Sequence, residues 1–316
     1  MFITITGAAG FIGSNLVKSL NEKGYTNLVL VDYPFQFSQT WKYSLAGIKY
    51  YDLITPEEYL DTYLRNKKYP YLTFHIGAIS DTMSYGDAEY FNNNYLYTER
   101  LLKHFEKGLE TNPDSYFINA SSSAVYGNKN VPLNAYAMSK KIIDNKISTF
   151  HNTKFNSNIV SCRFFNVYGF GEFHKGQMAS MIYKMYREYL SSKKITLFKD
   201  GTQKRDFIYI KDLITNLLKL FPLDPTKNKT INYSNPIIDF GTGTSTSFYN
   251  IFKYVMDYFN NNTISPSYIN MPSQIQNTYQ VHTRASKNKD FILDIQYPIQ
   301  VGIKNYYHKL SICNGF

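Results

Sequence analysis

Cysteine is scarce in this chain of 316 residues, which has only Cys162 and Cys313. Two cysteines so far apart cannot form a disulfide framework, so we expect a reducing compartment. Long apolar runs are missing as well. A run such as residues 217–220 is far shorter than the ~20 apolar residues of a membrane helix, and the start does not resemble a signal peptide. We therefore expect a cytoplasmic protein with no membrane partner.

Blocks of like charge are also absent. The 34 basic residues exceed the 24 acidic ones and give a formal charge of +10, but the basic residues are scattered along the chain. A nucleic-acid partner is therefore not favoured, and a small phosphorylated substrate accounts for the charge equally well. With 43% hydrophobic and 18% charged residues, the chain is expected to fold around a substantial core. We expect no metal ion.

A glycine-rich turn follows the first apolar run of the chain. Residues 2–6 are apolar or β-branched and lead directly into Gly7, Gly10 and Gly13. Residues 14–22 then have the apolar spacing of an amphipathic helix. In a dinucleotide-binding turn the first glycine permits the tight bend, the second lets amides approach the pyrophosphate, and the third brings helix and strand together.

A second strand is predicted at residues 28–31, and it ends at Asp32. A strand, a glycine turn, a helix and a strand ending in an acidic residue predict a dinucleotide-binding unit. Asp32 is expected to accept hydrogen bonds from the adenosine ribose.

The alternation of strand and helix patterns continues and predicts an α/β fold with a doubly wound parallel Rossmann sheet. Further strands are expected at 48–51, 71–76, 116–120 and 160–165, and helices at 56–65 and 91–109. The carboxyl ends of parallel strands lie at one edge of the sheet, where ligands bind. The glycine turn and the serine-rich residues after 120 are therefore expected to meet.

The regular alternation ends near residue 165. We expect residues 1–165 to form the NAD(P)-binding Rossmann domain and residues 166–316 to form mostly a smaller C-terminal substrate-binding domain. A segment near 205–235 is expected to return to the first domain. The elements predicted in this half are helices at 179–190 and 213–220, a returning strand within 204–210, a loop at 222–233 and a strand at 237–240.

Tyr136 and Lys140 lie one helical turn apart, on one face of a helix that would begin near Asn134. A phenol with a pKa near ~10 is a poor base at neutral pH, and a nearby cation lowers that pKa. We therefore predict that Lys140 lowers the pKa of Tyr136, which then takes a proton from an alcohol held by Ser122. Tyr-x-x-x-Lys alone is a weak pattern, and a serine at a strand end often caps backbone instead.

Several segments, spread over nearly the whole chain, together resemble one family. They are residues 6–13, 78–82, 93–95, 173–180, 204–207 and 279–283, with Ser122, Tyr136 and Lys140. On these residues the chain resembles the extended short-chain dehydrogenase/reductases that act on nucleotide sugars. Within that family it most resembles the enzymes that epimerise ADP-glycero-manno-heptose at C6.

The resemblance implies transient oxidation of the heptose at C6. A nicotinamide cofactor removes hydride while a base takes the hydroxyl proton, and the ketone then turns and receives the hydride on its other face. The family uses two acid/base groups, which match Tyr136 and Lys175. A lysine partly removed from water near another cation has its pKa lowered toward neutrality, which suits this role. From the sequence alone, Lys175 is equally a solvated loop cation or a phosphate contact.

The dinucleotide pattern and the resemblance together define two sets of binding residues. The cofactor set is Gly7, Gly10, Phe11, Ile12, Gly13, Asp32, Tyr33, Asp52, Gly77, Ala78, Asn93, Tyr136, Lys140, Val167 and Lys175. The substrate set is Ser80, Asn166, Gln177, Lys184, Phe198, Lys199, Asp200, Gly201, Arg205 and Tyr279. Arg205 matches an arginine that binds the ADP diphosphate through its planar donors, and its alternative is a surface ion pair with Asp206. The resemblance also implies a homo-oligomer.

Cofactor choice is open between NADP and NAD. The family commonly uses NADP, yet Asp32 is followed by Tyr33 and Pro34, with no basic residue before Lys42. A carboxylate at this position repels a 2′-phosphate, which favours NAD.

Two other functions stay open. One is a 4-epimerase or 4,6-dehydratase of a UDP- or dTDP-sugar. Dehydratases need an Asp-Glu pair where this chain has Ser123 and Ala124, and a 4-epimerase has no counterpart of Lys175. The other is a non-catalytic Rossmann module, which has no need of the Ser122 and Tyr136 apparatus. The loop between those two residues is shorter than is usual in the family, so one wall of the sugar pocket is expected to differ.

Overall fold

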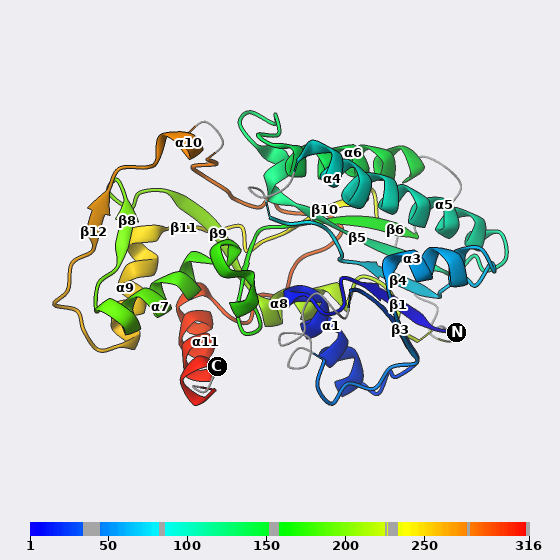
Figure 1. Ribbon diagram of the computed structural model, residues 1–316, viewed down its shortest axis with the longest axis horizontal. Coiled ribbons are helices and arrows are strands. Elements are labelled where there is room, and N and C mark those ends of the chain that lie inside the picture. Colours follow the sequence, from blue (N-terminus) through cyan, green and yellow to red (C-terminus); the bar gives the residue numbers. More distant parts are fainter. Residues whose placement is uncertain are drawn as a thin grey trace.

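The structure is a computed structural model that describes residues 1–33, 45–81, 86–151, 158–224, 226, 233–276 and 279–313. A seven-stranded parallel sheet, seen on the right of Figure 1, has the order β10-β6-β5-β4-β1-β2-β3. Its strands are β1 (Ile3–Thr6), β2 (Leu28–Val31), β3 (Asp52–Ile54), β4 (Leu72–His75), β5 (Tyr116–Ser122), β6 (Ile159–Phe164) and β10 (Ile237–Phe240). The order reverses between β1 and β4, where ligands bind in open α/β sheets. The predicted doubly wound Rossmann sheet is confirmed.

Helices cover both faces of this sheet (Figure 1). They are α1 (Phe11–Glu22), α3 (Pro56–Tyr59), α4 (Asp87–Tyr90), α5 (Tyr97–Leu109), α6 (Ala135–His151) and α8 (Ile210–Leu217). A π-helical turn at Leu60–Leu64 continues α3, and another at Phe91–Leu96 joins α4 to α5. The apolar sides of α5 and α6 form one hydrophobic cluster with β2, β5 and β6, and those of α1 and α8 contribute to a second.

The rest of the chain forms smaller sheets and helices, on the left of Figure 1. The strands are β7 (Asn166–Tyr168), β8 (Thr196–Phe198), β9 (Lys204–Tyr209), β11 (Ser245–Ser247) and β12 (Ser267–Ile269), paired as β11-β9-β7 and β12-β8. The helices are α7 (Met181–Ser192), α9 (Phe248–Tyr258), α10 (Ser273–Gln276) and α11 (Ile299–Ile312), and 3₁₀ turns occupy Ser123–Tyr126 and Phe173–Met178.

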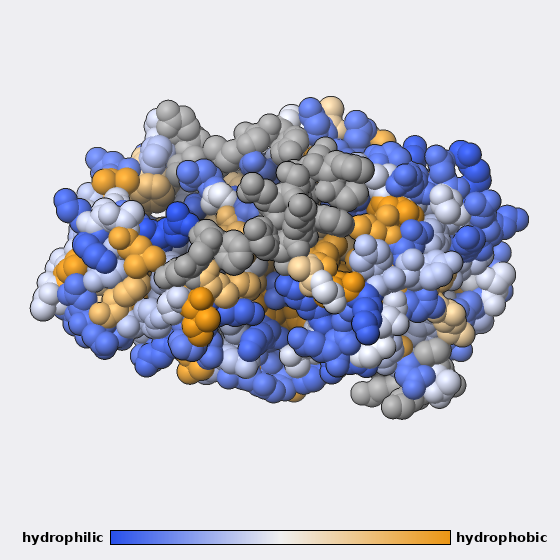
Figure 2. All heavy atoms as spheres, turned by 60° about the horizontal axis from the view of Figure 1, so that its bottom comes forward, coloured by the Kyte–Doolittle hydropathy of each residue, from blue (hydrophilic) through white to orange (hydrophobic). Residues whose placement is uncertain are grey.

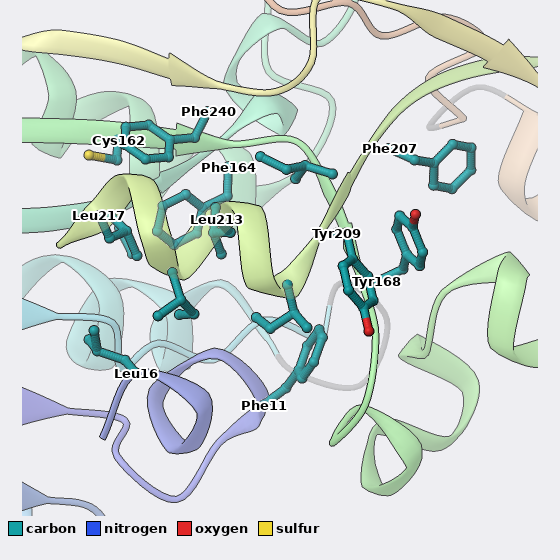
Figure 3. Close-up of a cluster of buried hydrophobic side chains, with 14 of the residues drawn as sticks. Phe11, Leu16, Cys162, Phe164, Tyr168, Phe207, Tyr209, Leu213, Leu217 and Phe240 are labelled. Atoms are coloured by element: carbon teal, nitrogen blue, oxygen red, sulfur yellow. The ribbon is translucent and has the colours of Figure 1, made fainter. Parts of the chain in front are cut away.

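One hydrophobic core joins the two parts of the molecule. It extends from α1 and the central sheet into α7, α9 and α11. Figure 3 shows α8 lying between the sheet and α1, with Leu213 and Leu217 on the helix and Phe164 on the strand side. Because the core is shared, the position of the smaller part relative to the sheet edge is set by packing.

Two predicted strands differ from the structure. Residues 48–51 are not a strand, because the Asn21 side chain hydrogen-bonds both the amide and the carbonyl of Lys49 at 2.7 and 2.9 Å. Residues 204–209 form the predicted strand, β9, but it pairs with β7 and β11, and the chain returns to the central sheet through α8 and then β10. The predicted loop at 222–233 lies mostly outside the described residues, and helix α11, at Ile299–Ile312, was not predicted.

The face shown in Figure 2 is mostly hydrophilic, with hydrophobic residues gathered mainly toward its middle. Among the helices of the described ranges, none combines the length and the apolar character needed to cross a membrane.

Candidate active site

The glycine turn packs closely against the loop that follows β4. Gly7 has a φ of 67°, and a Cβ added there would lie 2.6 Å from the Cα of Gly77. A Cβ on Gly13 would lie 2.0 Å from the carbonyl oxygen of Gly7, so the first turn of α1 is pressed against the loop. The structure thus confirms the tight bend at Gly7 and the close approach at Gly13 that the sequence predicted.

Helix α1 begins directly after Gly10 and presents backbone amides to this turn. Its first turn has no acidic side chain and no side-chain hydrogen bond at the cap, so no side chain competes with an anion for the amides there. Gly10 has no Cβ that would hinder an approaching phosphate. Phe11 is buried and Ile12 packs partly against the core, so both are held in place as parts of the cradle. The cradle fits a dinucleotide pyrophosphate.

Asp32 holds the glycine turn from the end of β2. Its carboxylate accepts hydrogen bonds of 2.8 Å from the amides of Ala9 and Tyr33. Burial raises the pKa of Asp32, and these amides counteract the shift. The predicted neighbour Asp52 is the first residue of β3 and accepts a hydrogen bond of 2.8 Å from the Tyr63 hydroxyl. Contact of Asp52 with a cofactor stays a prediction.

Tyr136 and Ser122 meet at the edge of the sheet, as predicted. Tyr136 lies in the first turn of α6, and its phenol is close enough to the Ser122 side chain, at the end of β5, for that side chain to influence its pKa. Burial raises the pKa of Tyr136, and the Ser122 side chain opposes that rise. The Ser122 oxygen also accepts a hydrogen bond of 3.2 Å from the Ala124 amide, so Ser122 caps backbone as well.

Lys140 does not act on Tyr136 as the sequence predicted. Its ammonium donates a 2.7 Å hydrogen bond to the carbonyl oxygen of Ala120, and burial lowers its pKa to about 8. The pKa of Tyr136 is raised, with burial as the largest cause, so the predicted lowering by Lys140 is wrong for this structure. The reason is geometric, because the carbonyl of β5 lies within reach of the ammonium.

The loop after β4 is braced by a residue that the sequence analysis missed. Asn94 is buried, and its side chain accepts from the Ile79 amide at 2.9 Å and donates to the Ile79 carbonyl at 3.0 Å. The predicted residue, Asn93, is exposed, and its amide donates to the Glu89 carbonyl at 3.0 Å. Adjacent helical residues differ by about 100° in direction, so the side chain that supports the Gly77 loop is Asn94.

Lys175 lies beside the glycine turn. It belongs to the 3₁₀ turn after β7, and its Nζ is 5.9 Å from the centre of the Phe11 ring. Lys175 is half-buried, and burial lowers its pKa while Glu172 raises it. A second contact holds this segment, since Asn15 donates a 3.1 Å hydrogen bond to the Phe170 carbonyl. Lys175 is therefore not a freely solvated loop cation.

Arg205 forms an aromatic-lined site with two other residues of the substrate set. It is only 8% exposed, its guanidinium lies 5.0 Å from the Tyr279 ring centre, and the Phe198 ring meets Tyr279 edge-on at 6.4 Å. Asp206 is turned away and accepts hydrogen bonds from the amides of residues 242, 243 and 285. The alternative of an Arg205–Asp206 ion pair is therefore wrong.

The other predicted site residues take varied positions. Ser80, Gln177, Lys199 and Asp200 are exposed, Gly201 is buried, and Ala78, Asn166, Val167 and Lys184 are half-buried. Asn166 donates to the Asp206 carbonyl at 3.1 Å and to the Thr283 hydroxyl at 3.0 Å. Contact of these residues with a ligand stays a prediction. Within the described ranges, no group of three or more His, Cys, Asp or Glu is placed to hold a metal ion.

Together, the reversed strand order, the glycine cradle and the Ser122–Tyr136 pair define a dinucleotide-binding enzyme of the short-chain dehydrogenase/reductase class. The model of the NAD dependent epimerase/dehydratase family matches residues 3–232. The chain belongs to this family. The predicted family, class of enzyme and nicotinamide cofactor are thereby confirmed.

Individual relatives agree with this assignment. The chain is 33% identical to the ADP-L-glycero-D-manno-heptose-6-epimerase of Brachyspira hyodysenteriae over 335 aligned positions, covering 99% of each chain. It is 32% identical to the enzyme of the same name from Alkalilimnicola ehrlichii, covering 96% of each. The crystal structure of the Helicobacter pylori ADP-L-glycero-D-manno-heptose-6-epimerase matches with a TM-score of 0.79 and 27% identity, over 98% of this chain and 96% of that one. A UDP-glucuronic acid 4-epimerase from Bacillus cereus shares the fold, with a TM-score of 0.77 and 24% identity over 99% of this chain and 100% of that one.

Proposed function

We propose that the protein interconverts ADP-D-glycero-D-manno-heptose and ADP-L-glycero-D-manno-heptose at C6 of the sugar. The observation that supports this most is the placement of two acid/base candidates on separate elements around the dinucleotide cradle. Tyr136 lies close to Ser122 at the end of β5, and Lys175 lies beside Phe11 at the start of α1. Epimerisation needs a proton donor for each face of the ketone, which two such groups supply.

Each site residue has its own proposed role in the reaction. The cradle formed by Gly7, Gly10 and Gly13 would hold NAD, which when bound would supply the capacity to accept a hydride and to return it. Ser122 would hold the C6 oxygen and Tyr136 would take its proton, a role in which the positive charge of a bound oxidised nicotinamide would oppose the burial that raises the pKa of Tyr136. After the ketone has turned, Lys175 donates the proton that completes the alcohol of the other configuration. Arg205 binds the diphosphate, which keeps the nucleotide in place while the sugar turns.

NAD is the proposed cofactor. Asp32 is fixed by the amides of Ala9 and Tyr33 at the end of β2, where a dinucleotide fold places the adenosine ribose. A carboxylate there accepts from the ribose hydroxyls and repels a 2′-phosphate. Pro34 and Lys42, on which the sequence argument also relied, lie outside the described residues. Titration of the protein with NAD and with NADP tests this preference. The Asp32→Asn variant is expected to show a smaller difference between its affinities for NAD and for NADP.

Proton NMR of purified protein with ADP-heptose tests the reaction, since interconversion changes the signals at C6. Tyr136→Phe and Lys175→Met are each expected to lower kcat by about 10²–10⁴-fold, because each removes a general acid or base. Both variants should still bind NAD. The control is Lys194→Met, since Lys194 is exposed and outside the proposed site. Unchanged turnover by Lys175→Met would refute the two-base assignment.

A second candidate is a 4-epimerase of a UDP- or dTDP-sugar, and the short loop after Ser122 favours it. Asn128 and Val131 close this loop with mutual backbone hydrogen bonds of 3.0 and 2.9 Å, and Lys129 and Asn130 have positive φ angles. This tight turn forms a shorter wall of the sugar pocket than the longer loop that is usual in the family. A pocket with a shorter wall admits sugars other than heptose. The same NMR assay with UDP-glucose and dTDP-glucose separates the candidates.

We further propose that the protein acts in the cytoplasm as a homo-oligomer. Light scattering of the purified chain tests the assembly, and a monomer at working concentration would contradict it.

A further inference from the structure

We propose that Glu172 is a positioning residue that holds Lys175 at the site and acts as the counter-charge shared by Lys175 and Lys184. This inference rests on the proposed acid/base role of Lys175. Glu172 lies just before the 3₁₀ turn that contains Lys175. It lies outside the residues on which the family resemblance rests.

The carboxylate of Glu172 ties together the two ends of the Lys175 segment. It is 1% exposed. At one end it accepts a 3.1 Å hydrogen bond from the Gly169 amide, and at the other it accepts from the Ser180 amide at 2.6 Å and the Ser180 hydroxyl at 2.8 Å. Each of these groups donates, and an ionised carboxylate only accepts, so the contacts suit the charged form.

The backbone of Glu172 also sets the start of the turn. Its carbonyl oxygen accepts a 2.9 Å hydrogen bond from the Lys175 amide. Ser180 in turn caps α7, since its hydroxyl accepts from the Tyr183 amide at 3.2 Å. The position of Lys175 beside Phe11 therefore depends on one buried carboxylate that fixes the segment to β7 and to α7.

Two cations share this carboxylate. Burial lowers the pKa of both Lys175 and Lys184, and Glu172 raises both. Burial raises the pKa of Glu172, and the hydrogen bonds from Ser180 and Gly169 and, last, the charge of Lys175 oppose that rise. His174 is a further titratable neighbour of Lys175, and burial and then the charge of Lys175 lower its pKa.

The other titratable groups that act on Glu172 within the described ranges are phenols. They are Tyr168 on β7 and Tyr306 and Tyr307 on α11, and burial raises the pKa of each. Neutral phenols add no charge, so Glu172 supplies the local negative charge. A lysine that donates a proton must first be protonated, and Glu172 opposes the burial that would strip Lys175 of its proton.

Glu172→Gln tests this role, with Ser180→Ala as the matched control. Glu172→Gln removes the charge and nearly preserves the shape, whereas Ser180→Ala removes two hydrogen bonds, one to Glu172 and one from the Tyr183 amide, and keeps the charge. One readout is the titration of Lys175 by ¹³C NMR of reductively methylated protein with NAD, its signal identified by its loss in Lys175→Met. The other is the pH dependence of kcat.

Glu172→Gln is expected to lower the pKa of Lys175 by about 1 unit, the usual effect of removing an adjacent opposite charge. The alkaline limb of kcat should shift downward by a similar amount. Ser180→Ala should leave both values in place, even if kcat falls. If Glu172→Gln does not fold, Glu172→Asp withdraws the charge by one methylene and should shift both values in the same direction by less.

The two hypotheses fail in different ways. An inactive wild-type protein, or a fully active Lys175→Met, would overturn the proposed function, while the NMR titration would still report the coupling of Glu172 to Lys175. An active wild type with an inactive Lys175→Met, combined with an unshifted Lys175 titration and pH profile in the Glu172 variant, would overturn the role of Glu172 alone.

Discussion

The ammonium of Lys140 donates a 2.7 Å hydrogen bond to the carbonyl oxygen of Ala120. Ala120 lies on β5 two residues before Ser122, and Tyr136 lies on α6 one turn before Lys140. The bond therefore ties the strand that presents the serine to the helix that presents the tyrosine. Lys140 thus bridges the two elements that carry Ser122 and Tyr136, and its charge is not among the causes of the raised pKa of Tyr136.

The buried state of Lys140 predicts a pH dependence of stability. Burial lowers its pKa from 10.5 to about 8, so the folded state disfavours the charged form. The free-energy cost of burying the charged ammonium is fully present below pH 8. It is lost as pH rises toward 10.5, the pKa of this lysine in the unfolded chain. Between these limits the free energy of unfolding of wild type should rise relative to Lys140→Met, by at most about 3 kcal/mol.

Urea denaturation of both proteins at intervals from pH 7 to 10.5 measures this difference. The exposed Lys194→Met serves as the control and should track wild type at every pH. A difference between wild type and Lys140→Met that stays constant with pH would contradict the burial argument.

Gly10 and Gly13 of the glycine turn are expected to respond differently to substitution by alanine. A Cβ on Gly13 would lie 2.0 Å from a backbone oxygen that cannot move aside, so Gly13→Ala should destabilise the fold by about 3 kcal/mol or more. Gly10 has an ordinary φ of −71°, and its Cβ would meet its nearest atom at 3.3 Å. Gly10→Ala should change stability by no more than about 1 kcal/mol and instead weaken NAD binding.

Thermal melting and NAD titration of the two variants check this pair. Equal losses of stability would mean that the close packing of α1 against the turn is not what requires Gly13.

The parts of the fold that depend on local pattern could be predicted from the sequence. The run 28–31 and the run 237–240 are strands with the predicted bounds, because short apolar runs buried on both faces are typical of parallel sheets. The partner of Lys140 could not be predicted, since the carbonyl comes from a strand 20 residues earlier. The short strands β8, β11 and β12 have three residues each, too few to show a period.

The sequence pattern is sufficient to choose Asn94 over Asn93 as the buried residue. Thr98, Leu101 and Phe105 are buried on α5, and stepping back four residues from Thr98 gives Asn94. The prediction of Asn93 ignored this helical face. A buried asparagine on an apolar face needs partners, and the loop after β4 supplies them.

Asn94→Ala should therefore be costly, and Asn93→Ala should not. Removing the Asn94 amide leaves both backbone groups of Ile79 without their side-chain partner, for a loss of about 1–3 kcal/mol. Asn93 is exposed, and its loss should change stability by no more than about 0.5 kcal/mol. Chemical denaturation of the two variants, with NAD titration of each, is the measurement. The reverse ranking would show that Asn94 does not support the Gly77 loop.

Arg205→Lys tests whether planar recognition of the diphosphate matters. The guanidinium lies 5.0 Å from the ring centre of Tyr279 and 5.9 Å from that of Phe248, and its Nη1 donates a 3.1 Å hydrogen bond to the Lys204 carbonyl, so its other donors are left for phosphate oxygens. Lysine keeps the charge and loses the fork, so one charge-assisted hydrogen bond, about 1.5–3 kcal/mol, is expected to be lost. KM for ADP-heptose should rise about 10–100-fold, with a much smaller change in kcat, because the diphosphate is bound alike in ground and transition states.

Steady-state kinetics and calorimetry with ADP measure the two effects. Arg187→Lys is the matched control, because Arg187 is exposed on α7 and meets only the Tyr183 hydroxyl at 3.4 Å among the contacts seen in the structure. If kcat fell and KM stayed unchanged, Arg205 would act on the reacting sugar and not on the diphosphate. If the affinity for ADP matched wild type as well, the diphosphate site would have to be sought elsewhere along the aromatic-lined wall.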